Sequence, residues 1–328
     1  MIKSKKILVT GAGGFIGFHL TNNLKKNGNY IRTVDVKAPE EWLSINGHTA
    51  IYYSDDHVVG DLKDYNVCKS ATKDIDIVFN LAADIGGMAY ITKYAAPLMY
   101  NNALVNLNML QASSENNVGR FFFSSSACAY PYTLQEDLNS NPLKEGDAIP
   151  ANPDSFYGWE KLFTERLCEA YEKDTGLSTC IARFHSIYGI GCAYDEERGK
   201  APASISRKVI LARNGDKIEI WGDGKQQRTF LYIDDCIDGI IKITESRHNK
   251  AFNLGTDNMV SIDELADMII EIGEKKLIKS YNLSKPRGVN SRCADINLAK
   301  QELDWEPRIS LKEGIRKTYD WVKSDLGK

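Results

Sequence analysis

The sequence predicts an α/β protein, with a doubly wound parallel sheet and a smaller C-terminal α/β lobe. Three observations predict this fold class. An apolar run at 6–10 precedes a glycine-rich turn and a helical pattern that ends at Gly28. Further apolar runs alternate with helical patterns, at 30–36, 74–83, 120–126 and 178–184. Two of the helical stretches, 97–117 and 155–175, are long and amphipathic. This alternation is typical of parallel strands that are buried on both faces and joined by helices.

The pattern loosens in the second part of the chain. The expected elements there are a loop over 187–202, a helix from Pro202, a short strand and turn within 216–235, and a strand and helix over 251–273. Proline suits a first helical turn, and Ser261 with Glu264 forms a capping box. We expect residues 1–184, with elements returning near 229–254, to form the nucleotide-binding domain. Residues 185–328 should form mainly a substrate lobe over the carboxyl ends of the strands, where ligands bind in open sheets.

Composition limits the possible partners and compartments. The chain has 328 residues, a charged fraction of 26% and a net charge of -3, so we expect neither a nucleic-acid nor a membrane partner. The apolar run near the N-terminus is too short for a signal sequence, and no stretch approaches the length of a membrane span. Seven scattered cysteines without a C-x-x-C pair predict no disulfide framework and no metal site. A cytoplasmic protein is the natural interpretation.

The glycine turn points to a dinucleotide. Gly11, Gly14 and Gly17 are spaced G-x-x-G-x-x-G between the first strand and the first helix, where backbone can approach a pyrophosphate. Asp35 ends the next strand, where it would accept hydrogen bonds from the adenosine ribose and repel a 2′-phosphate. NAD is therefore favoured, although Arg32 and Lys37 lie close enough to keep NADP open. A turn that serves packing alone is the alternative.

Two further features concern the reaction and the adenine end of the cofactor. Tyr157 and Lys161 are four residues apart, so they share one face of a helix, and a neighbouring cation makes a tyrosine hydroxyl a more useful base. Ser126, at the end of a strand, could hydrogen-bond the same substrate hydroxyl. A surface pairing of tyrosine and lysine is the alternative for that pair. Asp61 could bond the adenine or serve equally well as a turn residue.

Taken in order, "TGAGGFIG", "NLAA", "SSSA", "YGWEK" and "RFHSIYG" resemble the extended short-chain dehydrogenases/reductases of the nucleotide-sugar epimerase and dehydratase group. The resemblance covers nearly the whole chain. It implies a Rossmann-type fold, a tightly held NAD, and a serine, tyrosine and lysine that move a hydride between the sugar C4 and the cofactor. The cofactor contacts that it implies also include Phe15, Ile16, Leu81, Ala82 and Ala83.

Cys128 stands out among the cysteines. It follows Ser126 by two residues, so strand alternation would project both side chains to the same side. A thiol beside the sugar can exchange protons with carbons that a neighbouring ketone has acidified. Dehydratases of this group carry an aspartate and a glutamate at positions 127 and 128, whereas this chain has Ala127 and Cys128. Lys200 is the best candidate for an acid on the opposite ring face. A solvated loop charge is the alternative for Lys200.

Further motifs, including "AADIGGMAYI", "SSACAYP", "GKAPASISRK" and "WGDGKQQRTFLYIDDC", are similar to those of the GDP-mannose 3,5-epimerase family. That resemblance implies oxidation at C4, epimerisation at C5 and C3, and reduction at C4, with Cys128 and Lys200 as the acid/base pair. The substrate contacts that it implies, besides Ser126, Cys128 and Lys200, are Gly86, Gly87, Met88, Ser186, Lys208, Gln226, Arg228 and Arg292. The planar donors of arginine suit a diphosphate at Arg228 and Arg292, with a loop salt bridge as the alternative for each.

Two positions depart from that family. Ser186 stands where the family has asparagine, and Gly199 where it has an acidic residue. A related GDP-sugar, or inversion at one carbon only, would fit the same residues. A 4-epimerase or 4,6-dehydratase is the alternative enzyme, and an NAD-sensing module without catalysis is the alternative of a different class. The family also implies a homodimer formed through the helical stretches 97–117 and 155–175.

Overall fold

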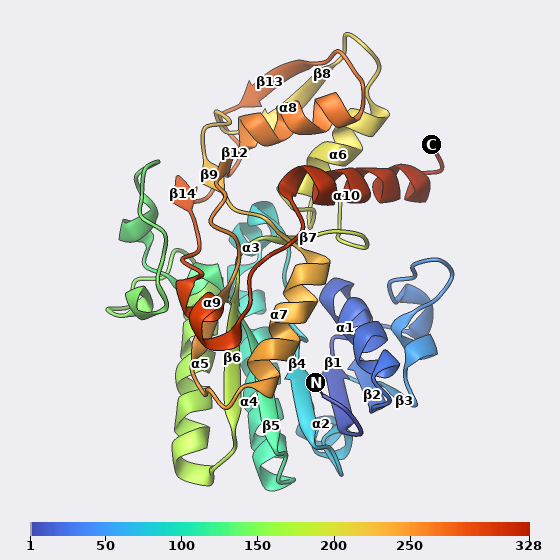
Figure 1. The fold of residues 1–328 in the computed structure, drawn as a ribbon, viewed down its shortest axis with the longest axis vertical. Coiled ribbons are helices and arrows are strands. Elements are labelled where there is room, and N and C mark those ends of the chain that lie inside the picture. The colour runs from blue at the N-terminus through green and yellow to red at the C-terminus, as the bar shows by residue number, and fades with distance from the viewer. Residues whose placement is uncertain (1) are drawn as a thin grey trace.

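A computed structural model describes residues 2–328 (Figure 1). Its centre is a seven-stranded sheet in which every pairing is parallel. In spatial order the strands are β11 (Ala251–Leu254), β6 (Thr179–Phe184), β5 (Arg120–Ser126), β4 (Ile77–Asn80), β1 (Lys6–Thr10), β2 (Tyr30–Asp35) and β3 (Asp56–Val59). The predicted α/β class with a parallel sheet is confirmed, and the order reverses between β1 and β4, where such sheets bind ligands.

Helices cover both faces of this sheet. Those on one face include α1 (Phe15–Lys26) and α7 (Ile233–Glu245), and those on the other include α2 (Tyr65–Ala71), α4 (Ala95–Glu115) and α5 (Phe156–Thr175). The chain also forms α3 (Met88–Lys93), α6 (Ala201–Leu211), α8 (Ile262–Ile272), α9 (Asn297–Leu303) and α10 (Leu311–Asp325). Helices α1 and α7 pack together, whereas α2 and α5 both pack against α4. The predicted strand at 120–126 and the two long helices are therefore present, with bounds that shift by at most two residues.

The three consecutive phenylalanines of β5 show how the strands divide the core. Phe122 belongs to one apolar cluster, whereas Phe121 and Phe123 belong to another. All three are fully buried, because alternate side chains of a central parallel strand enter the helical layers on opposite faces. The apolar run 74–83 is only partly a strand. It leaves the sheet after Asn80, because Thr10 Oγ1 accepts the next two main-chain N–H groups.

The second part of the chain builds a smaller lobe. Helices α6, α8 and α10 lie with β8 (Lys217–Trp221) and β13 (Ile278–Asn282) at the upper end of the molecule in Figure 1. The remaining short strands are β7 (Ile187–Tyr188), β9 (Gln227–Arg228), β10 (Leu231–Tyr232), β12 (Val260–Ser261) and β14 (Ser291–Arg292). The capping box predicted at Ser261 and Glu264 is present and begins α8. Helix α7 and β11 return to the central sheet.

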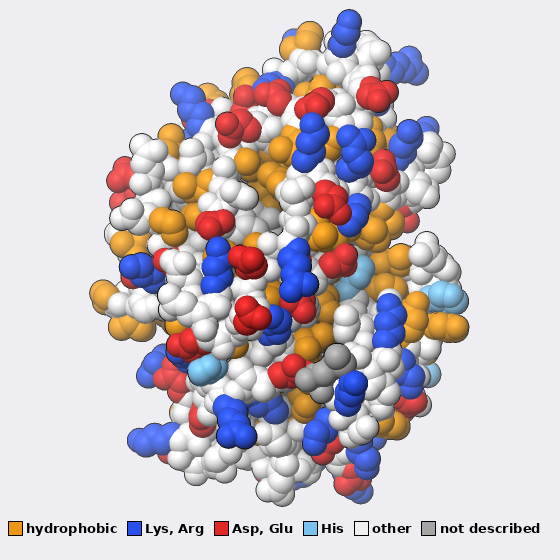
Figure 2. Space-filling model, in the orientation of Figure 1, with side chains coloured by type: hydrophobic (Ala, Val, Ile, Leu, Met, Phe, Trp, Pro, Cys, Tyr) orange, Lys and Arg blue, Asp and Glu red, His pale blue; other side chains and the backbone are white. Residues whose placement is uncertain are grey.

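The surface and the helices add two observations. On the face shown in Figure 2, acidic and basic side chains are interspersed rather than gathered into a patch of one sign. Within residues 2–328, no helix combines the length and the apolar character that a bilayer crossing needs.

Candidate active site

The glycine turn leaves no room for side chains. A Cβ on Gly17 would lie 2.3 Å from the carbonyl oxygen of Gly11, and a Cβ on Gly11 would lie 2.9 Å from the Ala82 main chain. Gly11 also has a φ of +66°, which favours glycine. Gly14 is the N-cap of α1 and has no side chain. No side chain therefore caps the first N–H groups of this helix. Such a helix end, reached by bare backbone, fits a pyrophosphate.

Asp35 completes the fit to a dinucleotide. Its side chain ends β2 and is buried, with Oδ2 accepting the Gly13 N–H at 2.9 Å and Oδ1 accepting the Lys37 N–H at 3.1 Å. Arg32 points elsewhere, because its guanidinium bonds Asp56 at 2.8 Å and two main-chain carbonyls. Arg32 therefore does not pair with the Asp35 carboxylate. A carboxylate without that pairing at this position suits the unphosphorylated ribose of NAD.

Most of the other residues expected at the cofactor lie around the same turn, whereas Asp61 follows β3. Phe15 and Ile16 open α1, and residues 81–83 follow β4. Leu81 and Ala82 both donate their N–H groups to Thr10 Oγ1 at 3.0 Å, which holds this segment beside the glycine turn. Asp61 accepts the Lys63 N–H at 2.9 Å, the contact of a turn residue, and its carboxylate is half-buried.

Tyr157 reaches the end of β5 through a close approach between two main chains. A Cβ on Gly158 would lie 2.0 Å from the carbonyl oxygen of Cys128, so only glycine lets α5 come this near. Ser155 caps the helix by accepting the Gly158 N–H at 3.1 Å. Burial raises the pKa of Tyr157 well above its ordinary value, and a hydrogen bond with Ser126 opposes that rise.

Lys161 lies one turn further along α5 and is buried. Its Nζ is 5.6 Å from the centre of the Tyr157 ring and 4.8 Å from the centre of the Phe123 ring. Burial lowers the pKa of Lys161, whereas the carboxylates of Glu160 and Glu165 raise it. The structure thus brings the predicted tyrosine, lysine and serine together at the carboxyl end of β5.

The expected strand position of Cys128 is wrong. Strand β5 ends at Ser126, and Cys128 lies in the 3₁₀ turn η3 (Ala127–Ala129), because Ser126 Oγ accepts the Cys128 N–H at 3.1 Å and turns the chain. Alternation therefore does not explain where the thiol points, although both side chains line the same cavity. Burial raises the pKa of the thiol, Asp154 raises it further, and Arg292 lowers it.

Lys200 lines this cavity from the smaller lobe. It is the N-cap of α6 and follows the loop at 190–199. The residue is accessible to solvent, yet it lies deep among protein atoms, so its accessible surface faces the cavity. Burial lowers the pKa of Lys200, whereas thiols that include Cys128 raise it. The thiol and the amine thus belong to one site.

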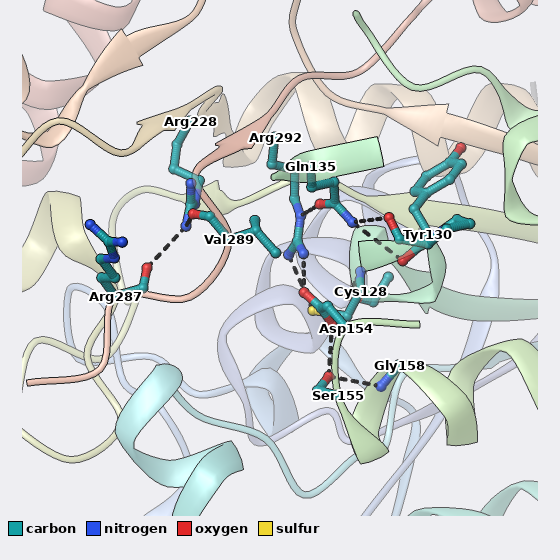
Figure 3. A network of polar contacts seen from close by, with 12 residues as sticks. Cys128, Tyr130, Gln135, Asp154, Ser155, Gly158, Arg228, Arg287, Val289 and Arg292 are labelled. Atoms are coloured by element: carbon teal, nitrogen blue, oxygen red, sulfur yellow. Dashed lines mark hydrogen bonds and ion pairs between the residues drawn. The ribbon is translucent and has the colours of Figure 1, made fainter. Parts of the chain in front are cut away.

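Arg292 occupies the thiol end of the cavity (Figure 3). Its Nη1 lies 3.3 Å from Cys128 Sγ, its Nε donates to Gln135 Oε1 at 2.6 Å, and its Nη2 forms a close ion pair with Asp154. The Asp154 carboxylate also accepts a hydrogen bond from Ser155 at 2.9 Å. The charge of Arg292 is therefore compensated within the protein.

Arg228 has a different environment (Figure 3). Its donors go to the main-chain carbonyls of Gln227, Arg287 and Val289 at 2.7, 3.1 and 2.7 Å. Among residues 2–328 no acidic side chain forms an ion pair with it. Burial and the charge of Arg292 both lower its pKa, but a guanidinium stays charged in proteins. The cavity wall therefore holds a cation without a counter-ion, which favours an anionic ligand.

The remaining residues expected at the substrate also line this cavity: Gly86, Gly87, Met88, Ser186, Lys208 and Gln226. Gln226 donates to the Trp221 carbonyl at 3.0 Å, but its own buried oxygen has no partner within residues 2–328. Lys208 donates to the Glu219 carbonyl at 2.7 Å. A Cβ on Gly87 would lie 2.7 Å from the Gly199 carbonyl oxygen. The two loops that carry these lining glycines are therefore in close contact.

The two departures from the family have local structural consequences. Ser186 adopts a left-handed φ of +47°, which is uncommon for residues other than glycine, asparagine and aspartate. A Cβ on Gly199 would lie 2.3 Å from the Asp195 carbonyl oxygen, so this loop has no space for an acidic side chain. The glycine thus belongs to a tight turn in the loop before Lys200.

Several lining residues were not predicted at the site, although Ile85, Trp221 and Phe230 lie within the quoted motifs. These unpredicted residues include Ile85, Asp154, Glu196, Trp221, Phe230 and Arg287. Asp154 stands just before the N-cap Ser155, where an acidic residue has an ordinary role at a helix start. Nothing local indicates its pairing with Arg292, which is 138 positions away.

Known proteins resemble the chain in both sequence and structure. Residues 7–255 match the model of the NAD dependent epimerase/dehydratase family. A GDP-mannose 3,5-epimerase of Arabidopsis thaliana is 42% identical over 98% of this chain and 83% of that protein. A GDP-L-fucose synthase of Escherichia coli is 25% identical over 98% of this chain and 97% of that protein.

Solved structures agree with this placement. A UDP-glucose 4-epimerase of Thermotoga maritima, solved with UDP-glucose, has a TM-score of 0.86 at 27% identity and covers 98% of this chain and 99% of that one. A UDP-glucuronic acid 4-epimerase of Bacillus cereus, solved with UDP-glucuronic acid and NAD, has a TM-score of 0.81 at 29% identity and covers 97% and 99%. The chain belongs to the NAD dependent epimerase/dehydratase family.

Proposed function

We propose that this protein is an NAD-dependent isomerase that converts GDP-mannose by epimerisation at C3 and C5. The observation that carries the proposal is the placement of Cys128 and Lys200 on the wall of one cavity with Ser126 and Tyr157. A reaction at C4 alone needs no second acid/base pair, whereas inversion at a neighbouring carbon needs one group to remove a proton and another to return it. The 42% identity to a GDP-mannose 3,5-epimerase supports the same choice.

The first step is oxidation at C4. The glycine turn and Asp35 would hold NAD, which would supply a reversible hydride acceptor for C4. Tyr157 removes the proton of the C4 hydroxyl, Ser126 orients that hydroxyl, and Lys161 supplies the positive charge that a tyrosinate needs in a buried site. The net result is a C4 ketone that acidifies the protons on C3 and C5.

The epimerisation uses the second pair of groups. Cys128, as the thiolate, removes a proton from C5 or C3, and the electron pair moves onto the C4 oxygen as an enolate. Lys200, as the ammonium, delivers a proton to the opposite face and restores the ketone with inverted configuration. Burial lowers the pKa of Lys200, which makes the ammonium a better acid. Arg292 stabilises the thiolate at 3.3 Å.

The two arginines have different surroundings, which supports assigning them to different parts of the substrate. Because Asp154 compensates Arg292, we assign that arginine to the reacting end beside Cys128. Arg228 lacks a counter-ion, so we assign it to the diphosphate, together with Lys208. The free oxygen of Gln226 is a further acceptor for the ligand.

We also infer a homodimer in a reducing, cytosolic compartment. Helix α5 exposes Phe156, Trp159 and Phe163 with exposed fractions of 63%, 42% and 49%, and the adjacent α4 exposes Tyr100 and Leu107. Apolar side chains grouped on two packed helices favour burial against a second copy. All seven cysteines are free, which suits a reducing environment. Light scattering of the purified protein tests the dimer, and Phe163→Glu should shift it toward monomer.

Two parallel incubations test the function. Each contains the purified protein and NAD, one with GDP-mannose and the other with UDP-glucose. We expect GDP-mannose to yield isomers of unchanged mass, separable by chromatography, with no net reduction of NAD. Conversion of UDP-glucose with GDP-mannose untouched would instead support a 4-epimerase. Loss of water from the sugar would support a dehydratase, and NAD binding without conversion of any nucleotide sugar would support a sensing module.

A further inference from the structure

Glu160 approaches Lys161 in an unusual way. The two residues are adjacent on α5, and each is only 1% exposed. Neighbouring residues on a helix do not face each other, yet Glu160 Oε2 lies 4.0 Å from Lys161 Nζ. Helix spacing alone therefore does not explain why the Glu160 carboxylate points toward Lys161, and other contacts must orient it.

A chain of buried hydrogen bonds provides that constraint. Glu160 Oε1 accepts from Asn106 Nδ2 at 2.7 Å and from Thr164 Oγ1 at 2.9 Å. Asn106 Oδ1 in turn accepts from Asn80 Nδ2 at 2.7 Å, and Asn80 Oδ1 accepts from Thr10 Oγ1 at 3.0 Å. The chain runs from α5 through α4 and β4 to the end of β1, directly before the glycine turn. One carboxylate oxygen is thus fixed by Thr164 of α5 and by Asn106 of α4, and the hydrogen bonds of Asn106 extend to the end of β1.

The other oxygen has no hydrogen-bond partner. Glu160 Oε2 is buried, and within residues 2–328 it accepts no hydrogen bond. A buried carboxylate oxygen without a partner is costly unless a cation compensates it. Lys161 is the cation within reach.

We propose that Glu160 is the counter-ion of Lys161, a positioning residue that keeps this buried lysine protonated beside Tyr157. The inference rests on the proposed function, since it gives a reason why the Tyr157–Lys161 pair can work in a buried site. Neither Glu160 nor Lys161 is among the residues that line the cavity, whereas Tyr157 is.

The other groups around Lys161 do not replace Glu160. The neighbours of Lys161 on α5 are Tyr157, Glu165 and Cys168, and its neighbour on β5 is the uncharged ring of Phe123. Glu165 is already compensated, because its Oε2 forms an ion pair with Arg183 at 2.6 Å. Burial lowers the pKa of Lys161, and among the charges that oppose this, Glu160 acts most strongly.

A double-mutant cycle on thermal stability tests the pair without any turnover. At pH 8, Lys161→Met leaves the Glu160 carboxylate buried without its cation, so the melting temperature should fall by several degrees. Glu160→Gln keeps the acceptor for Asn106 and removes the charge. We expect the double variant to melt above Lys161→Met alone. Equal effects of Glu160→Gln in both backgrounds would overturn the inference.

The pH profile provides the second readout. In Glu160→Gln, the alkaline limb of kcat/KM with GDP-mannose should move to lower pH by about one unit or more, since an opposite charge within a few ångströms shifts a pKa by that amount. Thr164→Val is the matched control, because it removes a hydrogen bond to Glu160 and keeps the charge. A rate that is lower by the same factor at every pH would indicate a merely structural role and contradict the inference. If no nucleotide sugar is turned over, the proposed function fails while the melting cycle still decides the role of Glu160.

Discussion

Arg292 Nη1 lies 3.3 Å from Cys128 Sγ, so a residue of the C-terminal lobe contacts the thiol at the end of the central sheet. The same guanidinium is paired with Asp154, which immediately precedes the start of α5. The thiol therefore lies beside one cation and one anion, with opposite effects on its pKa.

Substitution of these two neighbours should move the Cys128 pKa in opposite directions. Arg292 lowers that pKa, so Arg292→Gln should raise it. Asp154 raises it, so Asp154→Asn should lower it. The pH dependence of thiol alkylation measures both, with Cys128→Ala identifying the signal. A shift in the same direction in both variants would contradict the electrostatic assignment.

Lys200 should be needed for the proton transfers and not for binding. We expect Lys200→Met to lower kcat by about 100-fold or more, the usual loss for a general acid, with little change in KM. Lys208→Met is the matched control at the other end of the cavity, and it should raise KM more than it lowers kcat. Steady-state kinetics with GDP-mannose distinguish the two patterns. Full activity of Lys200→Met would exclude its assigned role.

Asp35 should set the choice between NAD and NADP. Its carboxylate is not compensated by Arg32, so a 2′-phosphate would meet an anion. Asp35→Ser should weaken NAD binding by about tenfold, because hydrogen bonds to the ribose are lost. The ratio of the NADP dissociation constant to the NAD dissociation constant should also fall. Titration calorimetry with both dinucleotides checks this. An unchanged preference would place the discrimination elsewhere.

Gly158 should tolerate no side chain. Gly158→Ala places a Cβ 2.0 Å from the Cys128 carbonyl oxygen, so α5 must move away from the turn that holds the thiol. We expect a loss of about 1–3 kcal/mol in the free energy of unfolding, together with a large loss of activity. Gly146→Ala is the control, because its Cβ would meet no atom within 4 Å. Urea unfolding compares the variants, and equal stability of the two would contradict the close approach.

The elements that local patterns specify could be predicted from the sequence. The apolar run of β5, the capping box of α8 and the glycine turn before α1 each contain their own signal. The spacing of Tyr157 and Lys161 likewise placed both on one face of a helix.

Contacts between distant segments could not be predicted in this way. The turn at Cys128 depends on the Ser126 hydroxyl, which ends the strand two residues before the thiol. The pairing of Asp154 with Arg292 joins residues with no common local pattern. The tight loop at Gly199 reflects the Asp195 main chain and is not visible in a residue-by-residue comparison.

The most direct test of the central claim is proton NMR of GDP-mannose in heavy water with the purified protein and catalytic NAD. We predict loss of the C3 and C5 proton signals and the appearance of new sugar signals, both abolished by Cys128→Ala. Retention of both protons in the presence of bound NAD, or exchange that persists undiminished in Cys128→Ala, would contradict the account.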